Sequence, residues 1–497
     1  MLLFSAKSYI IYMYVLLWLV MIIYHRKEEF FMPTSDRLFE RLKGKKIAFV
    51  GTGVSHNDLI MMFLAHGMDV TVCDRKFREQ LGSLAEGFAE AGAKLSLGNS
   101  YLDDAAKCDV VFRTPGMYFN NSDLTEMRRK GVVVTSEMEV FFDLCPCKIY
   151  GITGTDGKTT TTTIISEMLA HSGKTVHKCG NICRALLPII DEIKPEDAAV
   201  VELSSFQLIS MRKSPDFAAI TNVYPDHLNV HSGMEEYIDA KKNLIAHQNA
   251  FSRTVLNMDN EITNGLSDCV RGDLYKFSTK SVPERGAYFD GEWLCFTDGN
   301  TTEKIVRKDD IKIPGMHNVE NYLTAIAMLH GEVAKEDMEY VAKNFGGVEH
   351  RIELVRELDG VKYYNDSIAT SPISVIAGLK AFNRRIIVIA GGYDKKLDYG
   401  MLSEPINTYV KTLVLLGETA DKIEAAVRAY DGYSEDNCKI IRVSSMEEAV
   451  EAARDAAVSG DIVTLSPASA SFDLYRNFEE RGHHYKKLVN SLSERNN

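Results

Sequence analysis

Short apolar runs alternate with amphipathic stretches along the chain from residue 45 onward. The first run reads Lys-Ile-Ala-Phe-Val-Gly-Thr-Gly over residues 46–53, and a helical pattern follows over residues 58–66. Further strands are predicted at residues 70–74, 109–112 and 132–135. Such alternation is typical of βαβ units, in which helices cover a parallel sheet. The first part of the chain therefore predicts an open α/β domain.

The same alternation returns in two later parts of the chain. Strands are predicted at residues 149–153, 198–201, 217–221, 254–257, 386–390, 412–416 and 461–465, with a helix over residues 446–457. A chain of 497 residues also exceeds the size at which one hydrophobic core stops growing. We predict an α/β fold of three doubly wound domains, spanning residues 45–146, 147–347 and 348–497, after a leader of residues 1–44.

The leader contains an unbroken apolar and aromatic run over residues 9–24, followed by His25, Arg26 and Lys27. Sixteen residues are few for a membrane span, which needs about 20. A signal peptide is disfavoured because no small-residue cleavage site follows. A membrane tether with its basic flank inside the cell stays open. We favour a translation start at Met32, or a dispensable leader, so membrane contact is expected only if the leader is native.

The composition is that of an ordinary globular protein, with 45% hydrophobic and 25% charged residues. The net charge of −12 argues against a nucleic-acid binder, which needs a basic surface. The nine cysteines are an odd number, and we expect reduced thiols in a cytoplasmic protein. Cys145 with Cys147, and Cys179 with Cys183, could be metal ligands, but no second pair stands at zinc spacing. We expect a monomer.

A glycine-rich segment, Gly151-Ile-Thr-Gly-Thr-Asp-Gly-Lys-Thr159, follows a predicted strand and opens a predicted helix. Glycines allow a tight turn whose backbone N–H groups face phosphate oxygens, and the helix start adds a positive dipole. Lys158 would meet the β- and γ-phosphates, and the Thr159 hydroxyl could ligate magnesium. The spacing departs from the strict phosphate-loop pattern at Ile152. The alternative is an ordinary glycine-rich turn, which the Lys-Thr pair at the helix start disfavours.

Polar side chains follow two of the apolar runs in the same part of the chain. Glu202 ends the run at residues 198–201, and Asp226-His227 comes just after the run at residues 217–221. Ligands of open α/β sheets bind beyond the carboxyl ends of strands, so these side chains suit a magnesium nucleotide. Tyr237 and Lys241 share one helix face. An ammonium repels a cation, so Lys241 as it stands cannot ligate a metal, and a solvated lysine is the alternative.

Several motifs together resemble the Mur ligase family, and within it the members that add D-glutamate. The resemblance covers the chain from Lys45 to its end. The motifs are Gly154-Thr-Asp-Gly-Lys-Thr159, Gly180-Asn-Ile182, Glu202-Leu-Ser-Ser-Phe-Gln-Leu208, Asp226-His227, Gly315-Met-His-Asn-Val-Glu-Asn321, His350-Arg351, Asn365-Asp-Ser367, Gly391-Gly-Tyr-Asp-Lys395, Leu465-Ser-Pro-Ala-Ser-Ala-Ser471 and Phe478-Glu-Glu-Arg-Gly482.

The resemblance implies an ATP-dependent ligase that joins D-glutamate to UDP-N-acetylmuramoyl-L-alanine through an acyl phosphate, in cell-wall synthesis. It implies a Rossmann-like UDP-binding domain, a P-loop central domain that binds ATP, and a Rossmann-like C-terminal domain that binds D-glutamate. Two magnesium ions are implied, one held by Thr159 and Glu202, the other by His227 and by Lys241 as its carbamate. With Lys158, these residues are the implied catalytic set.

The resemblance also implies binding residues. The implied ATP-binding residues are Gly154, Thr155, Asp156, Gly157, Lys158, Thr159, Thr160, Asn318, Asn321, Arg351 and Asp366. The implied substrate-binding residues are Gly53, Val54, Ser55, Arg75, Lys76, Gly116 and Asn181 for the UDP-linked substrate, and Thr370, Lys395, Ser471 and Phe478 for D-glutamate.

The chain departs from the family pattern at several positions. Asp156 stands where Asn is frequent, and Cys183 where Gly commonly follows Asn-Ile. Ile368 and Ser371 replace a usual Lys and Asn, so their loop lacks the cation that the family pattern has there.

Other functions are weighed against this one. Gly51-Thr-Gly53 with Asp74 resembles a dinucleotide fingerprint, but His56 occupies the third glycine position, which disfavours NAD. Another Mur-type ligase, a folylpolyglutamate synthase-like enzyme and a non-catalytic nucleotide-binding subunit are the alternatives.

Overall fold

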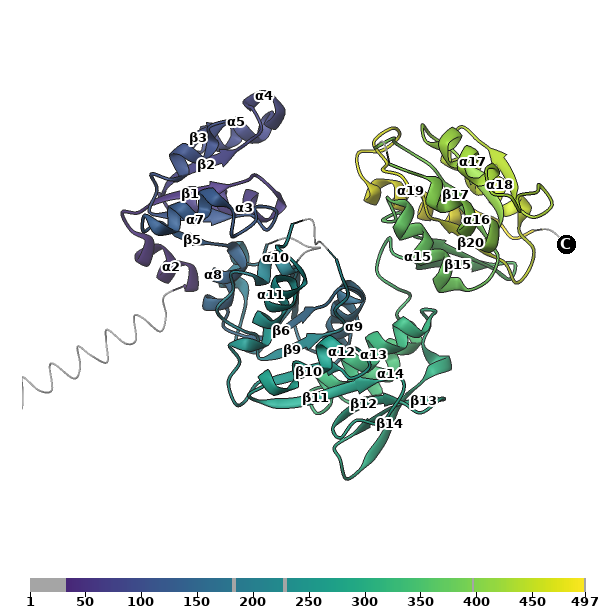
Figure 1. Cartoon of the computed structure of the whole chain (residues 1–497), viewed down its shortest axis with the longest axis horizontal. Coiled ribbons are helices and arrows are strands. Elements are labelled where there is room, and N and C mark those ends of the chain that lie inside the picture. Colours follow the sequence, from purple (N-terminus) through teal and green to yellow (C-terminus); the bar gives the residue numbers. More distant parts are fainter. Residues whose placement is uncertain (1–32, 181–184, 227–229, 396, 496–497) are drawn as a thin grey trace, which may run out of the picture. The chain divides into compact units, whose positions relative to one another are not determined.

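A computed structural model describes residues 33–180, 185–226, 230–395 and 397–495. Three separate β-sheets with flanking helices follow one another along the chain (Figure 1). They fall within residues 46–135, 148–307 and 353–465. The mixed α/β class with three sheets is as predicted, whereas the predicted boundaries after residues 146 and 347 stay predictions.

The first sheet is five-stranded and parallel, in the order β3-β2-β1-β4-β5. Its strands are β1 (Lys46–Val50), β2 (Asp69–Asp74), β3 (Lys94–Leu97), β4 (Val110–Arg113) and β5 (Val133–Thr135). The helices are α2 (Thr34–Leu42), α3 (Val54–Ala65), α4 (Arg78–Leu81), α5 (Ser83–Glu90), α6 (Tyr101–Ala105), α7 (Ser122–Arg129) and α8 (Glu137–Leu144). Phe49, Phe63 and Phe112 pack together beneath α3, where burial of three rings supplies much of the local core.

The central sheet has nine strands in the order β14-β13-β12-β11-β10-β9-β6-β8-β7. Its strands are β6 (Lys148–Thr153), β7 (Val176–Gly180), β8 (Ala198–Glu202), β9 (Phe217–Ile220), β10 (Arg253–Asn257), β11 (Asp273–Ser278), β12 (Gly286–Phe289), β13 (Trp293–Thr297) and β14 (Thr302–Arg307). The helices are α9 (Lys158–His171), η1 (Leu187–Glu192), α10 (Ser205–Leu208), α11 (Met234–Ala246), α12 (Glu261–Asn264), η2 (Ser267–Cys269), η3 (Lys308–Asp310), α13 (Met316–Leu329) and α14 (Lys335–Asn344). Strands β6, β8 and β9 are parallel, as predicted, because each is largely apolar and buried. Strand β7, which carries His177 and Lys178, pairs parallel with β8 and was not predicted. The antiparallel strands β12, β13 and β14 were not predicted.

The third sheet has six strands in the order β15-β16-β20-β17-β18-β19. Its strands are β15 (Glu353–Leu358), β16 (Val361–Asn365), β17 (Ile386–Ala390), β18 (Val410–Leu415), β19 (Lys439–Arg442) and β20 (Ile462–Leu465). The helices are α15 (Pro372–Phe382), η4 (Gly400–Leu402), α16 (Ser403–Tyr409), α17 (Ala420–Arg428), α18 (Met446–Ala456) and α19 (Phe478–Ser491). An apolar core lies on each face of this sheet, which is the doubly wound arrangement that the sequence predicted.

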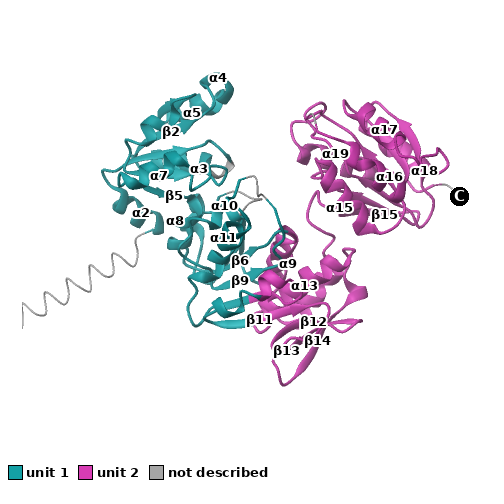
Figure 2. Cartoon of the chain, in the orientation of Figure 1, with its two compact units in different colours: residues 1–155, 173–254, 265–274 teal, residues 156–172, 255–264, 275–497 magenta. Residues whose placement is uncertain are grey.

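The chain divides into two compact units, shown in Figure 2. Unit 1 contains residues 1–155, 173–254 and 265–274, and unit 2 contains residues 156–172, 255–264 and 275–497. The first sheet and strands β6 to β9 thus belong to unit 1, while α9, α13 and the third sheet belong to unit 2.

The apolar run at residues 9–24 lies outside the described residues, which begin at residue 33. Within the described part of the chain, no helix is both long enough and apolar enough to cross a membrane. Helix α2, which follows the leader's apolar run, buries Leu38 and Phe39, and the Phe39 ring meets Phe63 edge-on at 5.1 Å. Residues 34–42, assigned to the leader by the sequence, are therefore packed against the first sheet's core.

Candidate active site

The glycine-rich segment forms a loop between strand β6 and helix α9. Gly154 has φ +153°, and a Cβ there would lie 1.9 Å from Thr221 Oγ1. The Thr155 N–H donates to the carbonyl oxygen of Asn222 at 2.9 Å. Only glycine fits this close approach, so the loop is held tightly against the end of β9. Unit 1 therefore fixes the first half of the predicted phosphate loop.

The second half of the loop begins helix α9 in unit 2. Gly157 is its N-cap with φ +80°, and a Cβ there would lie 2.5 Å from Asn321 Oδ1. Lys158 and Thr159 are the first two helical residues, the former half-buried and the latter buried. Backbone N–H groups at a helix start have no partner within the helix and attract phosphate oxygens. The loop therefore leads directly into a helix start, as the sequence predicted, and its anion-binding role stays a prediction.

Glu202 lies at the edge of the sheet where this loop begins. It ends β8, and the parallel register places it opposite Ile152 of β6 and Gly180 of β7. Its side chain is 1% exposed. A buried carboxylate beside a phosphate loop is an oxygen donor of the kind that magnesium prefers. The predicted position of Glu202 beyond a strand end agrees with this arrangement.

Helix α11 places two side chains against the loop. Lys241 is 2% exposed, and its Nζ donates to the Gly154 carbonyl oxygen at 2.6 Å. The same ammonium lies 4.6 Å from the Tyr237 ring centre. The Tyr237 hydroxyl is 3.1 Å from Thr155 Oγ1. Both residues, four apart on the helix, therefore contact the loop, and the solvated-lysine alternative is wrong for Lys241.

Two of the predicted site residues lie outside the described part of the chain. These are Asn181, predicted for the UDP-linked substrate, and His227, predicted for the second magnesium ion. The metal set of Thr159, Glu202, His227 and Lys241 therefore stays a prediction.

The predicted nucleotide residues Asn318 and Asn321 lie on helix α13, which packs on α9 in unit 2. Thr161 Oγ1 donates to Asn321 Oδ1 at 3.1 Å, and Asn321 Nδ2 donates to Asn318 Oδ1 at 3.0 Å. Asn318 Nδ2 in turn donates to the Pro314 carbonyl oxygen at 2.6 Å. This chain of hydrogen bonds fixes both amides beside Gly157. The polar threonines of α9 thus have a structural role as well as any role toward a nucleotide.

The predicted residues of the C-terminal domain divide into exposed and buried groups. Arg351 and Lys395 are exposed, whereas Asp366 is 5% exposed and accepts from Ser466 Oγ at 2.9 Å. Burial raises the pKa of Asp366 to about 7, although hydrogen bonds from Ser466 and from the Ile352 N–H act in the opposite direction. Ser371, where the family pattern has Asn, caps helix α15 by accepting from the Ser374 N–H. Serine suits an N-cap, which accounts for this departure physically.

Arg481 organises the predicted D-glutamate loops, a role that the sequence analysis missed. Its guanidinium is 3% exposed and donates to the hydroxyl and carbonyl oxygens of Ser367, and to the carbonyl oxygens of Ser469 and Ala470. It therefore ties the loop before Thr370 to the loop before Ser471. The carbonyl oxygen of Phe478 accepts from Ser367 Oγ at 2.8 Å. Three of the four predicted D-glutamate residues thus lie on or next to segments that Arg481 joins; the fourth, Lys395, lies over the Phe472 ring.

A cavity of 680 Å³ opens at the carboxyl edge of the first sheet, within unit 1. Four of the residues predicted for the UDP-linked substrate line it, and these are Gly53, Arg75, Lys76 and Gly116. Val54 and Ser55 begin the adjacent helix α3. Cys179 and Gln207 from the central sheet's part of the chain complete the wall. A cavity of this size holds a ligand as large as a nucleoside diphosphate.

The broken dinucleotide fingerprint has a structural explanation. His56, at the third glycine position, is fully buried, and its Nδ1 lies 2.9 Å from the Gly51 carbonyl oxygen. Burial lowers the pKa of His56 to about 4. Burial would raise the pKa of Asp74, but donation from the Lys76 and Thr52 N–H groups and the Thr52 hydroxyl outweighs it, so this pKa is lowered. Asp74 therefore holds the loop of Thr52 and does not present a free carboxylate to a ribose.

Two buried ionisable groups of the cavity wall were also missed by the sequence analysis. Arg113 is 1% exposed and donates to the Met117 and Phe206 carbonyl oxygens and to Ser210 Oγ. Glu137 accepts from the Leu187 N–H at 2.9 Å, and burial raises its pKa to about 7. Both side chains connect the first sheet's part of the chain to residues that follow β6. Apart from Met117, their partners are distant in sequence, so no local pattern marks them.

A serine, a histidine and a glutamate form a connected group beside this cavity. Ser205 Oγ lies 2.9 Å from His231 Nε2, and His231 Nδ1 lies 3.1 Å from Glu236 Oε2. The hydroxyl of Tyr118, a cavity residue, donates to Glu236 at 2.5 Å. Ser205 is 2% exposed at the start of α10, so its hydroxyl is closed to a substrate. The group therefore orders the cavity wall and is no hydrolytic triad.

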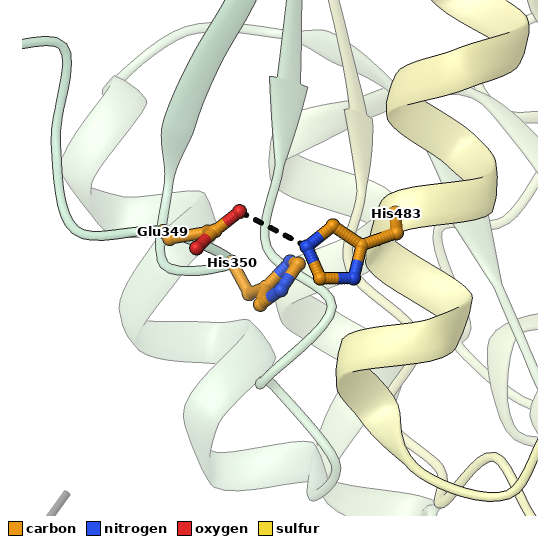
Figure 3. A group of neighbouring side chains, drawn as sticks. All are labelled: Glu349, His350 and His483. Atoms are coloured by element: carbon orange, nitrogen blue, oxygen red, sulfur yellow. Dashed lines mark hydrogen bonds and ion pairs between the residues drawn. The ribbon is translucent and has the colours of Figure 1, made fainter. Parts of the chain in front are cut away.

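Glu349, His350 and His483 gather in the C-terminal domain, as Figure 3 shows, with His483 on helix α19. Their nearest nitrogen and oxygen atoms lie within 4.8 Å of one another. Lys486 Nζ donates to Glu349 at 3.1 Å, and Asn365 Nδ2 donates to His350 Nδ1 at 2.8 Å. The neutral His350 ring therefore carries its proton on Nε2, and a metal would also compete with the ammonium for Glu349. The cluster suits hydrogen bonding better than metal binding.

The three α/β sheets and the glycine loop suit a nucleotide-binding protein, and two family models give its class as that of the ligases. The Mur ligase middle domain matches residues 152–329, and the Mur ligase glutamate ligase domain matches residues 350–469. Solved structures add support for the fold alone. The UDP-N-acetylmuramate–alanine ligase of Thermotoga maritima superposes with a TM-score of 0.54 at 17% identity, covering 90% of this chain and 99% of that one. The chain belongs to the Mur ligase family.

Within this family, two similar curated proteins carry the name UDP-N-acetylmuramoylalanine–D-glutamate ligase. The protein of that name from Acetivibrio thermocellus is 49% identical over 459 residues, covering 91% of this chain and 98% of the relative. That of Clostridium botulinum is 47% identical over 449 residues, covering 90% and 97%. Likeness at this level over nearly the whole of each relative places the chain among these ligases.

Proposed function

We propose that this protein joins D-glutamate to UDP-N-acetylmuramoyl-L-alanine with consumption of ATP, in the cytoplasm, as a step of peptidoglycan precursor synthesis. The observation that carries the proposal is the glycine loop that follows β6. Gly154 packs closely against Thr221, and Gly157 packs closely against Asn321. The buried Glu202 ends the neighbouring strand β8. The 49% identity to a ligase of that name supports the choice of substrates.

The first chemical step in this proposal transfers the γ-phosphoryl group of ATP to the carboxylate of the UDP-linked alanine. The ammonium of Lys158, at the start of α9, would offset charge on the transferring group. The N–H groups of the helix start hold the phosphate oxygens in place. The product of this step is an acyl phosphate, whose carbonyl carbon is open to attack by an amine.

The second step is attack by the D-glutamate amine on that carbonyl carbon. A tetrahedral intermediate forms, phosphate leaves, and the amine loses a proton. The segments that Arg481 ties together, which carry Thr370, Ser471 and Phe478, would hold D-glutamate, with Lys395 paired to a carboxylate. The role of the protein in this step is to position the amine and exclude water.

Magnesium fits part of the predicted set. The Glu202 carboxylate and the Thr159 hydroxyl are each an oxygen donor of the kind that magnesium prefers, and bound magnesium would neutralise phosphate charge. The Lys241 ammonium, donating to the Gly154 carbonyl, does not fit a cation. A carbamate on Lys241 would replace the positive group by two oxygen donors, so a second ion with His227 depends on that modification.

A phosphate-release assay on the purified chain tests the proposal. Phosphate release should require ATP, UDP-N-acetylmuramoyl-L-alanine and D-glutamate together, and L-glutamate should not replace D-glutamate. Lys158→Ala should abolish release. Lys335→Ala is the matched control, because Lys335 is likewise the first residue of a helix, α14, and pairs only with Glu339 at the surface among the ion pairs described. Release supported by a folate or by another amino acid would favour the related ligases, and no release at all would favour a non-catalytic subunit.

A further inference from the structure

Two cysteines stand in the short connection between helix α8 and strand β6. Cys145 is the C-cap of α8, Pro146 follows, and Cys147 immediately precedes β6. Their sulfur atoms are 3.6 Å apart. Cys145 is half-buried and Cys147 is 7% exposed. One thiol of the pair is therefore within reach of a small molecule, while the other is covered.

The two thiols differ in reactivity for physical reasons. The hydrogen bond between the two thiols lowers the pKa of Cys145, and nearby Lys213 acts in the same direction. The contact with Cys145, together with burial, raises the pKa of Cys147. Thiolates and not thiols attack disulfides, so Cys145 is the attacking group and Cys147 is the group that reacts second.

Among the described cysteines, this pair has features that the others lack. Cys73, Cys108, Cys179, Cys295 and Cys438 are buried. Cys269 is half-buried, as Cys145 is, but no second thiol contacts it in the described part of the chain. An accessible thiol with a second sulfur at contact distance is the arrangement that reversible dithiol oxidation needs.

We propose that Cys145 and Cys147 form a reversible modification site that is oxidised to a disulfide by low-molecular-weight disulfides. The Cys145 thiolate attacks one sulfur of the small disulfide and releases one small thiolate, which takes up a proton. The Cys147 thiol then loses its proton and attacks Cys145 Sγ, which releases the second small thiol. Two protein thiols are oxidised and one small disulfide is reduced to two thiols, so atoms and electrons balance.

The position of the pair gives this chemistry a structural consequence. The first residues of α8 include Glu137 and Met138, which line the cavity of unit 1, and β6 leads into the glycine loop. A bond between residues 145 and 147 fixes the backbone between these two elements. Small disulfide rings that include one intervening residue are also strained and readily reduced, which suits a reversible site in a reducing compartment.

Treatment of the full-length protein with oxidised glutathione, followed by mass spectrometry, tests the proposal. Denatured protein should show two fewer titratable thiols than the nine of the sequence, and dithiothreitol should restore them. Trypsin should release residues 131–148 as one peptide that holds both cysteines, lighter by two hydrogen atoms and without an adduct. A glutathione adduct that persists at Cys145 in the wild type, or an unmodified peptide, would overturn the proposal.

Single variants separate the two roles. Cys147→Ser should trap glutathione on Cys145, whereas Cys145→Ser should leave Cys147 reacting at least about tenfold more slowly. Cys269→Ser is the control, because it removes another half-buried thiol and should leave the oxidised peptide unchanged. Equal reaction rates of Cys145 and Cys147 in the two single variants would contradict the assigned order of attack.

Discussion

The Lys241 ammonium donates to the carbonyl oxygen of Gly154 over 2.6 Å, which joins helix α11 to the first glycine of the phosphate loop. The lysine is buried, so its position is set by packing and by this carbonyl group. A carbamate formed on the same nitrogen would present oxygen atoms to the same loop. The chemical state of one nitrogen therefore decides whether this edge of the loop attracts or repels a cation.

Lys241→Arg should abolish phosphate release, with a fall of at least about 100-fold, because a guanidinium cannot carry a carbamate and keeps a permanent positive charge beside the loop. Wild-type protein incubated with 13C-labelled bicarbonate should show a carbamate carbon signal that the variant lacks. Lys242→Arg, the next residue of the same helix and only half-buried, is the control and should keep its activity. Full activity of Lys241→Arg would rule out the carbamate.

Gly157→Ala should weaken ATP binding by at least about tenfold, because the new methyl group meets Asn321 Oδ1 at 2.5 Å and the backbone has φ +80°. Gly173→Ala is a matched control just after the same helix, since it has φ +91° and nothing within 4 Å of the new Cβ. Both variants share the backbone strain, and only Gly157→Ala adds the clash. Titration calorimetry with a non-hydrolysable ATP analogue measures the difference, and equal weakening in both variants would contradict the prediction.

Arg481→Lys should raise the KM for D-glutamate and leave the KM for ATP unchanged. A lysine ammonium cannot reach the Ser367 oxygens and the Ser469 and Ala470 carbonyl oxygens together, so the two loops separate. The loss of buried hydrogen bonds should also lower stability, by about 2–4 kcal/mol. Arg476→Lys, an exposed arginine of the same segment, is the control for both readouts. A changed thermal midpoint with an unaltered KM for D-glutamate would show that Arg481 has a structural role alone.

Glu137→Gln should change how stability depends on pH. Burial raises the pKa of Glu137 from 4.5 to about 7 in the folded protein, so the folded state binds the proton more tightly than the unfolded state. This contribution is fully present below pH 4.5 and is lost as the pH rises through 7. The stability of the wild type relative to the variant should fall across that window, by on the order of 1–3 kcal/mol. Thermal midpoints from pH 4.5 to 8 measure the trend, and a constant difference would contradict it.

The elements that carry the glycine loop could be predicted from the sequence because their signals are local. Strand β8 was predicted at residues 198–201 and ends at Glu202, and the Lys-Thr pair was predicted at the start of a helix. An apolar run predicts a buried strand, and the polar residue after it predicts which end of the strand faces the ligand. The same logic led to Lys241, since Tyr237 and Lys241 lie on one helix face, although the family resemblance was needed to give that lysine a function.

The antiparallel strands and the buried ionisable groups could not be predicted in this way. Strand β14 carries three exposed residues in succession, so no apolar run marks it. Arg113 and Arg481 would be assigned to the surface on composition alone, because arginine is almost never fully buried without partners. Their partners are mostly backbone carbonyl groups from other parts of the chain. Only the fold brings those groups together, so residue spacing in the sequence does not predict these hydrogen bonds.

The parallel pairing of β6 with both β8 and β9 has a practical consequence for engineering. Hydrogen bonds set Ile152 opposite Glu202 and Thr153 opposite Ile220, so the loop and the two neighbouring strand ends share one register. A chimera that exchanged the loop alone with that of a distant relative would inherit a mismatch with both neighbours. Residues 148–222 are therefore the smallest block that such a swap should carry.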